Sequence, residues 1–241
     1  MGQFQLHTVG SVFGASVNFT QSNLMMVIVG ALILALLFYG ARPRAVVPGR
    51  LQALAELCYE FTYKMCIEQI GEEGKRFFPF VFTLFFFILF GNLIGLVPYG
   101  FAYTSHVAVT GALALLVVVL CTVVALWIHG WRFFTYFLPP GVPLWLSPLI
   151  VPIEIVSYLS RVVSLAVRLF ANMMAGHVML EVFASFVVMF GAAGVLGDIA
   201  AVLPLGFIVI MFAFELLVAC LQAYVFAILT CIYLHDAVHL H

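Results

Sequence analysis

The sequence predicts an all-α integral membrane protein, and its composition and long apolar runs both support this prediction. Hydrophobic residues make up 66% of the 241 residues and charged residues only 8%, whereas a soluble domain has about a quarter charged residues. Apolar stretches that reach the ~20 residues needed for a membrane-spanning helix recur along the chain. Most of the surface must therefore face lipid or other subunits. The net charge of −1 gives no indication of nucleic-acid binding.

The chain is expected to form a single membrane domain, 1–241, that begins with a span over residues 22–41. Basic residues follow this span around two prolines: Arg42, Arg44 and Arg50. Basic residues beside a span usually mark the cytoplasmic side of the membrane. We therefore expect the N-terminus outside, the segment after the span inside, and, after the later spans, a cytoplasmic C-terminus.

The next three elements are predicted to be an interfacial amphipathic helix and a transmembrane hairpin. Residues 50–70 carry charges at every fourth position, with apolar residues largely on the other side: Glu56, Glu60, Lys64 and Glu68. This pattern is typical of a helix that lies in the membrane interface. Residues 77–97 and 107–128 are apolar and long enough to span the membrane.

The last third of the chain predicts two unusually long helices, 147–190 and 198–235, after a proline-rich link that includes Pro139, Pro140 and Pro143. From Pro152 to Phe190 a helix would measure on the order of 55 Å, against ~30 Å for the hydrocarbon core. Such runs either break into short helices or form a strongly tilted antiparallel hairpin. We favour the hairpin, turning at Gly191, Gly194 and Gly197, because no polar loop interrupts either run.

Ionisable residues lie well inside these two apolar runs, at Glu154, Arg161, Arg168, His177, Glu181 and Glu215. An ionised side chain at the bilayer centre costs ~2.5–3.5 kcal/mol on insertion scales. A salt-bridge network that only holds helices together is one explanation for them. Function is the favoured interpretation, because ionisable groups in the membrane usually mark ion or proton pathways.

The spacing of the polar residues places them on particular helix faces. Glu154, Arg161 and Arg168 are seven residues apart and share one face, which Asn172 extends and near which Ser164 lies. On the second helix Glu215 and Gln222 are also seven apart. His177 follows Arg168 by nine residues and is expected on the opposite face. The two helices are therefore expected to present a facing set of polar groups.

These residue types differ in what they can do with protons. An arginine does not deprotonate in proteins, so Arg168 can only supply a fixed positive charge. Histidine and glutamate can be tuned to gain and release protons, which makes His177 and Glu215 the candidates for a relay. Structural alternatives stay open: His177 as an interhelical hydrogen-bonding group, Arg161 as a snorkelling or lipid-binding side chain, and Glu181 as a partner of His177.

No metal or cofactor site is expected from the remaining candidates. The five cysteines are scattered without a C-x-x-C pair and are interpreted as apolar packing residues. The C-terminal residues His235, Asp236, His239 and His241 lack a closed ligand set. A solvated chain end is the favoured interpretation of this cluster.

One stretch closely resembles a known family: Ser164-Leu-Ala-Val-Arg168-Leu-Phe-Ala-Asn172-Met-Met-Ala-Gly176-His177 is similar to the signature of subunit a of F-type ATP synthases. Three other segments agree with it: Gly91-Asn92-Leu-Ile-Gly-Leu-Val-Pro98, the link Pro140-Gly-Val-Pro143, and Glu215 to Gln222. The resemblance extends from about residue 24 to the end. The histidine-then-glutamate order resembles alphaproteobacterial and mitochondrial members, with a bacterial inner membrane favoured. One departure is Val162, where many members have proline, and this predicts a straighter helix there.

The resemblance implies a proton-translocating stator subunit that performs no bond chemistry itself. Arg168 would face the carboxylates of a rotating ring of c subunits, and His177 and Glu215 would line an outer half-channel. Glu154 would lie near an inner half-channel, with Asn172 and Gln222 beside the arginine. The supporting or ring-facing positions would be Arg161, Ser164, Glu181 and Asn92. The implied partners are the c-ring, the b/b′ peripheral stalk and the F1 sector of the ATP synthase.

Two rival functions remain at this stage. A stand-alone secondary transporter or channel is disfavoured by the lack of a paired inverted repeat and of a substrate-sized polar set. A quinone- or haem-binding subunit of a respiratory complex is disfavoured because only His177 lies clearly within a span, and bis-histidine ligation needs two.

Overall fold

The computed structural model describes residues 8–11, 18–40, 49–97, 102–130, 146–192 and 194–239. These residues form six α-helices: α1 (Gln21–Gly40), α2 (Arg50–Ile70), α3 (Gly74–Leu96), α4 (Val107–His129), α5 (Ser147–Gly191) and α6 (Val195–Val238). Two short strands, β1 (Thr8–Ser11) and β2 (Asn18–Thr20), pair antiparallel before α1. A 3-10 turn, η2 (Tyr103–Ser105), precedes α4. The proline-rich link and the arginines at 42 and 44 lie outside the described residues.

The predicted all-α membrane class is confirmed. Within the described ranges, four helices are long and apolar enough to cross a membrane, namely α3, α4, α5 and α6. The apolar part of α1, Ser22–Phe38, is shorter. The arrangement of these helices in a bilayer, including the tilt of the last two, stays a prediction.

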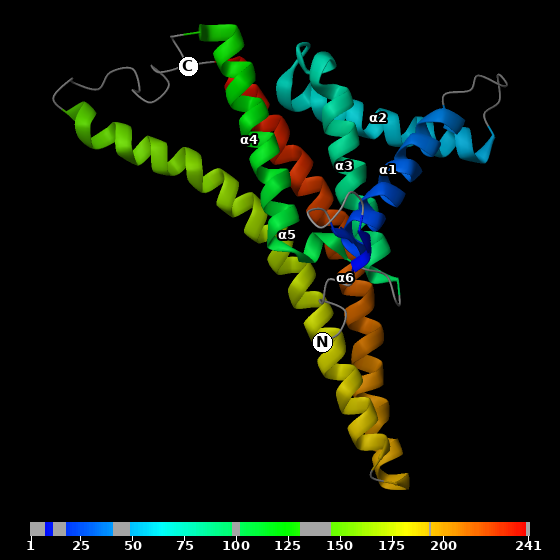
Figure 1. The fold of residues 1–241 in the computed structure, drawn as a ribbon. Helices are drawn as coiled ribbons and strands as arrows, with labels where there is room; N and C mark the ends of the chain where they lie inside the picture. The colour runs from blue at the N-terminus through cyan, green and yellow to red at the C-terminus, as the bar shows by residue number, and fades with distance from the viewer. Residues whose placement is uncertain are drawn as a thin grey trace.

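The longest elements are α5 and α6, with 45 and 44 residues, which together form a hairpin (Figure 1). At 1.5 Å per residue each helix is about 65 Å long. Pro152 and Pro204 lie inside the two helices without ending them. Gly194 adopts φ 84°, which a residue with a Cβ rarely adopts, and α6 begins directly after it. Gly197, expected in the turn, therefore belongs to α6.

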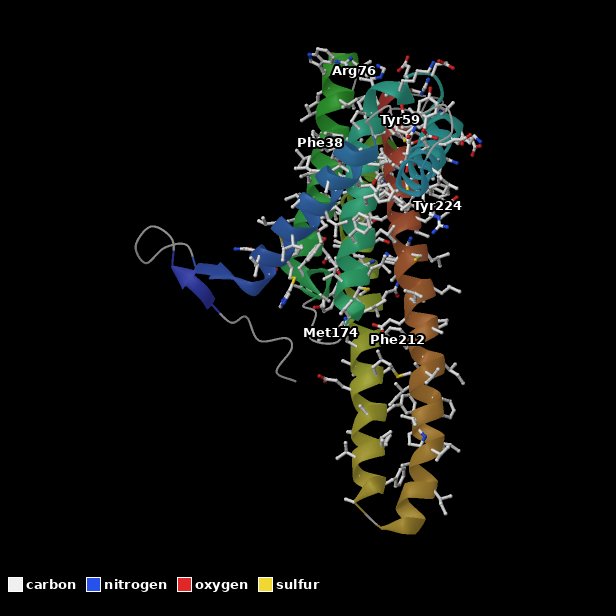
Figure 2. The ribbon with its side chains drawn as sticks, turned by 90° about the vertical axis from the view of Figure 1, so that its right-hand side faces the viewer. Phe38, Tyr59, Arg76, Met174, Phe212 and Tyr224 are labelled. Atoms are coloured by element: carbon white, nitrogen blue, oxygen red, sulfur yellow. The ribbon has the colours of Figure 1, made fainter. Side chains whose placement is uncertain are left out.

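The other helices pack around only one end of this hairpin. In both views α3, α4 and the C-terminal half of α6 run side by side, and α2 lies across the end of this group (Figures 1 and 2). The half of the hairpin next to its turn extends beyond them. The N-terminal end of α5 diverges from both α4 and α6, whereas the middle of α5 lies against α4 (Figure 1).

Aromatic residues fill the contact between α2, α3 and α6. Phenylalanines recur at every fourth position of α3 and form a ladder along it, with ring centroids 4.6–5.6 Å apart: Phe78, Phe82, Phe86 and Phe90. Phe61 of α2 lies 5.8 Å from Phe85 and 5.9 Å from Tyr224 of α6. The phenylalanine-rich sequence of α3 thus supplies the centre of the protein core.

Two glycines on α3 allow the turn η2 to pack directly against its backbone. Tyr103 of η2 is fully buried, and its hydroxyl donates a hydrogen bond of 2.7 Å to the Phe87 carbonyl. Burial raises the pKa of Tyr103, so the hydroxyl stays a donor. A Cβ at Gly91 would collide with the Tyr103 ring, and one at Gly95 would lie 2.6 Å from the Ala102 Cβ.

Replacing Gly91 with alanine is expected to destabilise the protein, because overpacking a filled contact costs about 1–3 kcal/mol. The thermal denaturation midpoint of the detergent-solubilised protein should fall. Gly111→Ala in α4 is the matched control, since a Cβ there meets nothing within 4 Å. Equal midpoints for the two variants would contradict the close packing of η2 on α3.

Candidate functional site

The predicted polar residues of α5 and α6 meet along the seam between the two helices. Asn172 of α5 donates a hydrogen bond of 2.9 Å from Nδ2 to Oε1 of Gln222 on α6. Gln222 is 3% exposed, and its Nε2 atom has no hydrogen-bond partner among the described residues. The facing polar set expected from the spacing is therefore present at this level of the hairpin.

Close to this pair, His177 of α5 lies next to Glu215 of α6. The His177 Nδ1 and Glu215 Oε1 atoms are 3.9 Å apart, and Glu215 is 5% exposed. Neither carboxylate oxygen of Glu215 accepts a hydrogen bond within the described part of the chain. A buried carboxylate without hydrogen bonds is costly when ionised. This environment therefore favours either a protonated carboxyl group or water molecules that bind it.

Gly176 makes room for this carboxyl group. A Cβ at position 176 would lie 2.5 Å from Glu215 Oε1 and 2.7 Å from its Cδ. The residue before His177 must therefore be glycine for Glu215 to keep its position between the helices. The sequence contains this glycine in the quoted stretch, but its spacing alone does not reveal its partner.

An open groove of about 520 Å³ reaches His177 and Glu181 from the surface. The end of α3 forms one wall with Gly95, Leu96 and Val97. Turns of α5 and α6 beyond the end of α3 form the rest, including Phe212, which is labelled in Figure 2. Apart from His177 and Glu181 the lining is apolar. The groove gives His177, the neighbour of Glu215, a route toward the surface.

Asn92 connects α3 to the same face of α6. It is fully buried and donates a 3.3 Å hydrogen bond from Nδ2 to the Ala219 carbonyl, while its Oδ1 has no partner among the described atoms. Ala219 lies between Glu215 and Gln222 on α6. Polar atoms without a hydrogen-bond partner among the described residues therefore lie along the buried face of α6, on Glu215, Asn92 and Gln222. Such atoms are commonly satisfied by buried water.

Arg168 lies one turn before Asn172 on α5 but, unlike Asn172, has no described hydrogen bond to α6. Its side chain is exposed, and no carboxylate of the described residues forms an ion pair with it. Ser164, one turn earlier on α5, is exposed as well. The arginine is therefore a fixed positive charge on an outer face of an apolar helix.

Arg161 has a partner that the sequence interpretation missed. Its Nη1 atom lies 3.4 Å from Oδ2 of Asp236 near the end of α6. Its guanidinium also lies 5.0 Å from the Tyr233 ring and 5.6 Å from the Tyr158 ring. The Tyr158 hydroxyl is 2.6 Å from Thr122 Oγ1 on α4. Arg161 thus belongs to a cluster that joins α4, α5 and α6.

This ion pair corrects the interpretation of the C-terminal cluster as a solvated chain end. Asp236 is 30% exposed and ion-paired, although His235 and His239 remain partly accessible; position 241 lies outside the described residues. A signal was available, because Asp236 follows Gln222 by fourteen residues, two heptads along the stripe that contains Glu215. Glu154, on the diverging end of α5, is half-buried and has no described ion-pair partner.

Comparison with known proteins gives a consistent result. The family model described as ATP synthase A chain matches residues 23–235. A protein named ATP synthase subunit a from Granulibacter bethesdensis is 65% identical over 100% of this chain and 96% of its own length. Proteins of the same name from Acidiphilium cryptum and Gluconacetobacter diazotrophicus are each 59% identical, over 100% and 99% of this chain and 96% of their own lengths.

The match covers α5, all but the last three residues of α6, and nearly all of the seam described above. With this similarity and four helices able to cross a membrane, the chain belongs to the ATP synthase A chain family, as a multi-pass membrane component of the bacterial ATP synthase complex.

Proposed function

We propose that the chain is the proton-conducting stator subunit of an F-type ATP synthase, with two offset half-channels that open toward a rotating c-ring. The observation that carries this proposal is the buried Glu215, which lies 3.9 Å from His177, a residue that lines an open groove. A carboxyl group and an imidazole can exchange protons near neutral pH. The subunit itself catalyses no bond formation, and ATP forms elsewhere in the complex.

The groove at His177 and Glu181 serves as the outer half-channel in this proposal. Its opening lies beside the end of α3, opposite the end where α2 packs, which supports separate access on that side. A proton that reaches His177 can pass to Glu215. Either carboxylate oxygen of Glu215 can accept it, because neither has a hydrogen-bond partner among the described residues. From Glu215 the orphaned atoms of Asn92 and Gln222 extend a polar route, with water, toward Asn172.

Arg168 supplies the second requirement, an anion-attracting charge that no proton can neutralise. An exposed guanidinium on an apolar helix is costly in lipid. A carboxylate on a neighbouring subunit removes this cost when it faces Arg168, which fits a ring of carboxyl-bearing c subunits. A protonated ring carboxyl group can then move into lipid, where an ionised one is costly.

The inner half-channel is assigned to the other end of α5, near Glu154 and the cluster around Arg161. This end lies toward the side on which α2 packs, and the basic segment before α2 is expected in the cytoplasm (Figure 1). The proposed topology has the N-terminus outside and the C-terminus in the cytoplasm. The peripheral stalk and the F1 sector complete the proposed complex.

The first test is ATP-driven proton pumping by the Arg168→Ala complex in inverted membrane vesicles. Pumping should fall to background while the complex still assembles, because nothing then attracts the ring carboxylate or separates the half-channels. Arg76→Ala, which removes an arginine from the start of α3, serves as the control and should pump normally. Normal pumping by an assembled Arg168→Ala complex would reject the stator proposal and reopen the stand-alone transporter alternative.

A second test moves the Glu215 carboxyl group without deleting it. Gly176→Ala places a Cβ against a flexible carboxyl end, so the helices stay paired while the carboxyl group shifts. We expect proton pumping to drop about tenfold with unchanged assembly, because a 1 Å displacement of a reacting group can lower a rate by ~10²-fold. The control is Gly206→Ala on α6, where a Cβ meets nothing within 4 Å. Equal pumping by the two variants would remove Glu215 from the route.

A further inference from the structure

Two cysteines from distant parts of the sequence meet in the protein core. Cys66 belongs to α2 and Cys231 to the last third of α6, 165 residues later. Their Sγ atoms are 4.0 Å apart, and neither side chain has exposed surface. Of the other cysteines, Cys58 is half-buried, Cys121 is buried and Cys220 is exposed. The two thiols play no part in the proton route proposed above.

The position of this pair is fixed by packing from both helices. Met65 and Ile70 of α2 and Ala227 and Leu234 of α6 belong to the same buried core, at 5% exposure or less. Gly74 lets the start of α3 approach the Cys66 carbonyl, since a Cβ there would lie 2.9 Å from that oxygen. The two sulfur atoms are therefore held close to van der Waals contact. Rotation of the two side chains has to bring them about 2 Å closer to reach the bond length of a disulfide.

We propose that Cys66 and Cys231 form a redox-modification site, at which a peroxide converts the two thiols into a disulfide that joins α2 to α6. Peroxide first oxidises one thiol to a sulfenic acid and is reduced to water. The second thiol then attacks that sulfur, the S–S bond forms, and a second water molecule leaves. Because both thiols lack exposed surface, the oxidant has to be small and uncharged, and hydrogen peroxide meets both conditions. A dithiol reductant reverses the reaction.

The disulfide stabilises the protein and lies too far from the proton-conducting groups to contact them. It connects residues 165 positions apart and so restricts the unfolded chain strongly. Cys231 follows Glu215 by sixteen residues, about 24 Å along α6. The bond fixes the interfacial helix to a helix that belongs to the stator and does not have to move. We therefore expect oxidation to raise thermal stability and to leave proton pumping within about twofold of its reduced value.

The experiment uses the purified ATP synthase complex, treated with hydrogen peroxide and then alkylated under denaturing conditions. Peptide mapping by mass spectrometry should find the peptides of Cys66 and Cys231 joined, with a mass two hydrogens below their sum. The denaturation midpoint of this subunit should rise by roughly 4–16 °C and return after dithiol reduction. Cys66→Ala should abolish both effects, and Cys58→Ala, on the same helix, should retain them.

Three results would overturn the proposal: full alkylation of both thiols after peroxide, joining of Cys231 to Cys121 instead, or a midpoint shift that persists in Cys66→Ala. If oxidation abolishes proton pumping in the wild type but not in Cys66→Ala, the claim that the disulfide leaves proton transport unchanged is overturned. Because the thiols lie outside the proton route, these outcomes do not depend on the Arg168 and Gly176 experiments.

Discussion

The structure depends on one constraint: polar groups placed in an apolar hairpin must satisfy one another across it. Three pairs of polar residues meet between α5 and α6: Arg161 with Asp236, Asn172 with Gln222, and His177 with Glu215. The first two pairs satisfy one another by an ion pair and a hydrogen bond, whereas the third is a 3.9 Å contact that leaves the Glu215 oxygens without a hydrogen bond among the described residues. Residue numbers rise along α5 as they fall along α6, as an antiparallel pair requires. In lipid an unsatisfied polar group costs several kcal/mol, so these pairs help to set the register of the two helices. The seam is thus both a structural element and the place where titratable groups collect.

The three pairs differ in character, and the differences follow from their neighbours. The Arg161 pair is surrounded by tyrosines and lies where α4 joins the hairpin, so its charges are shared among several contacts. The Asn172 pair is neutral and keeps its hydrogen bond at any pH. The His177 pair is the one with orphaned carboxylate oxygens and a groove beside it. Of these three pairs, it is the one that joins two titratable side chains beside a groove.

The sequence predicted the fold class and most of the residues that lie in the seam, because helical periodicity fixes which residues share a face. Glu215 and Gln222, seven apart, do lie on one buried stripe of α6. Pairing across the hairpin could not be predicted in the same way. It depends on where the turn falls, and α6 begins at Val195, earlier than the glycine pattern suggested. The partners of Arg161 and Gly176 were missed for this reason, since each lies on the other helix.

The residues of the seam do not by themselves explain how the hairpin conducts protons, and Arg168 shows why. Along α5 it lies seven residues after Arg161 and nine before His177, about 10 Å and 14 Å along the axis. A polar seam open at both ends would let protons cross without doing work. On the proposed function, Arg168 prevents this because its charge repels protons midway and attracts a carboxylate from outside. This role requires Arg168 to be accessible to another subunit, and its side chain is exposed, with no ion-pair partner among the described residues.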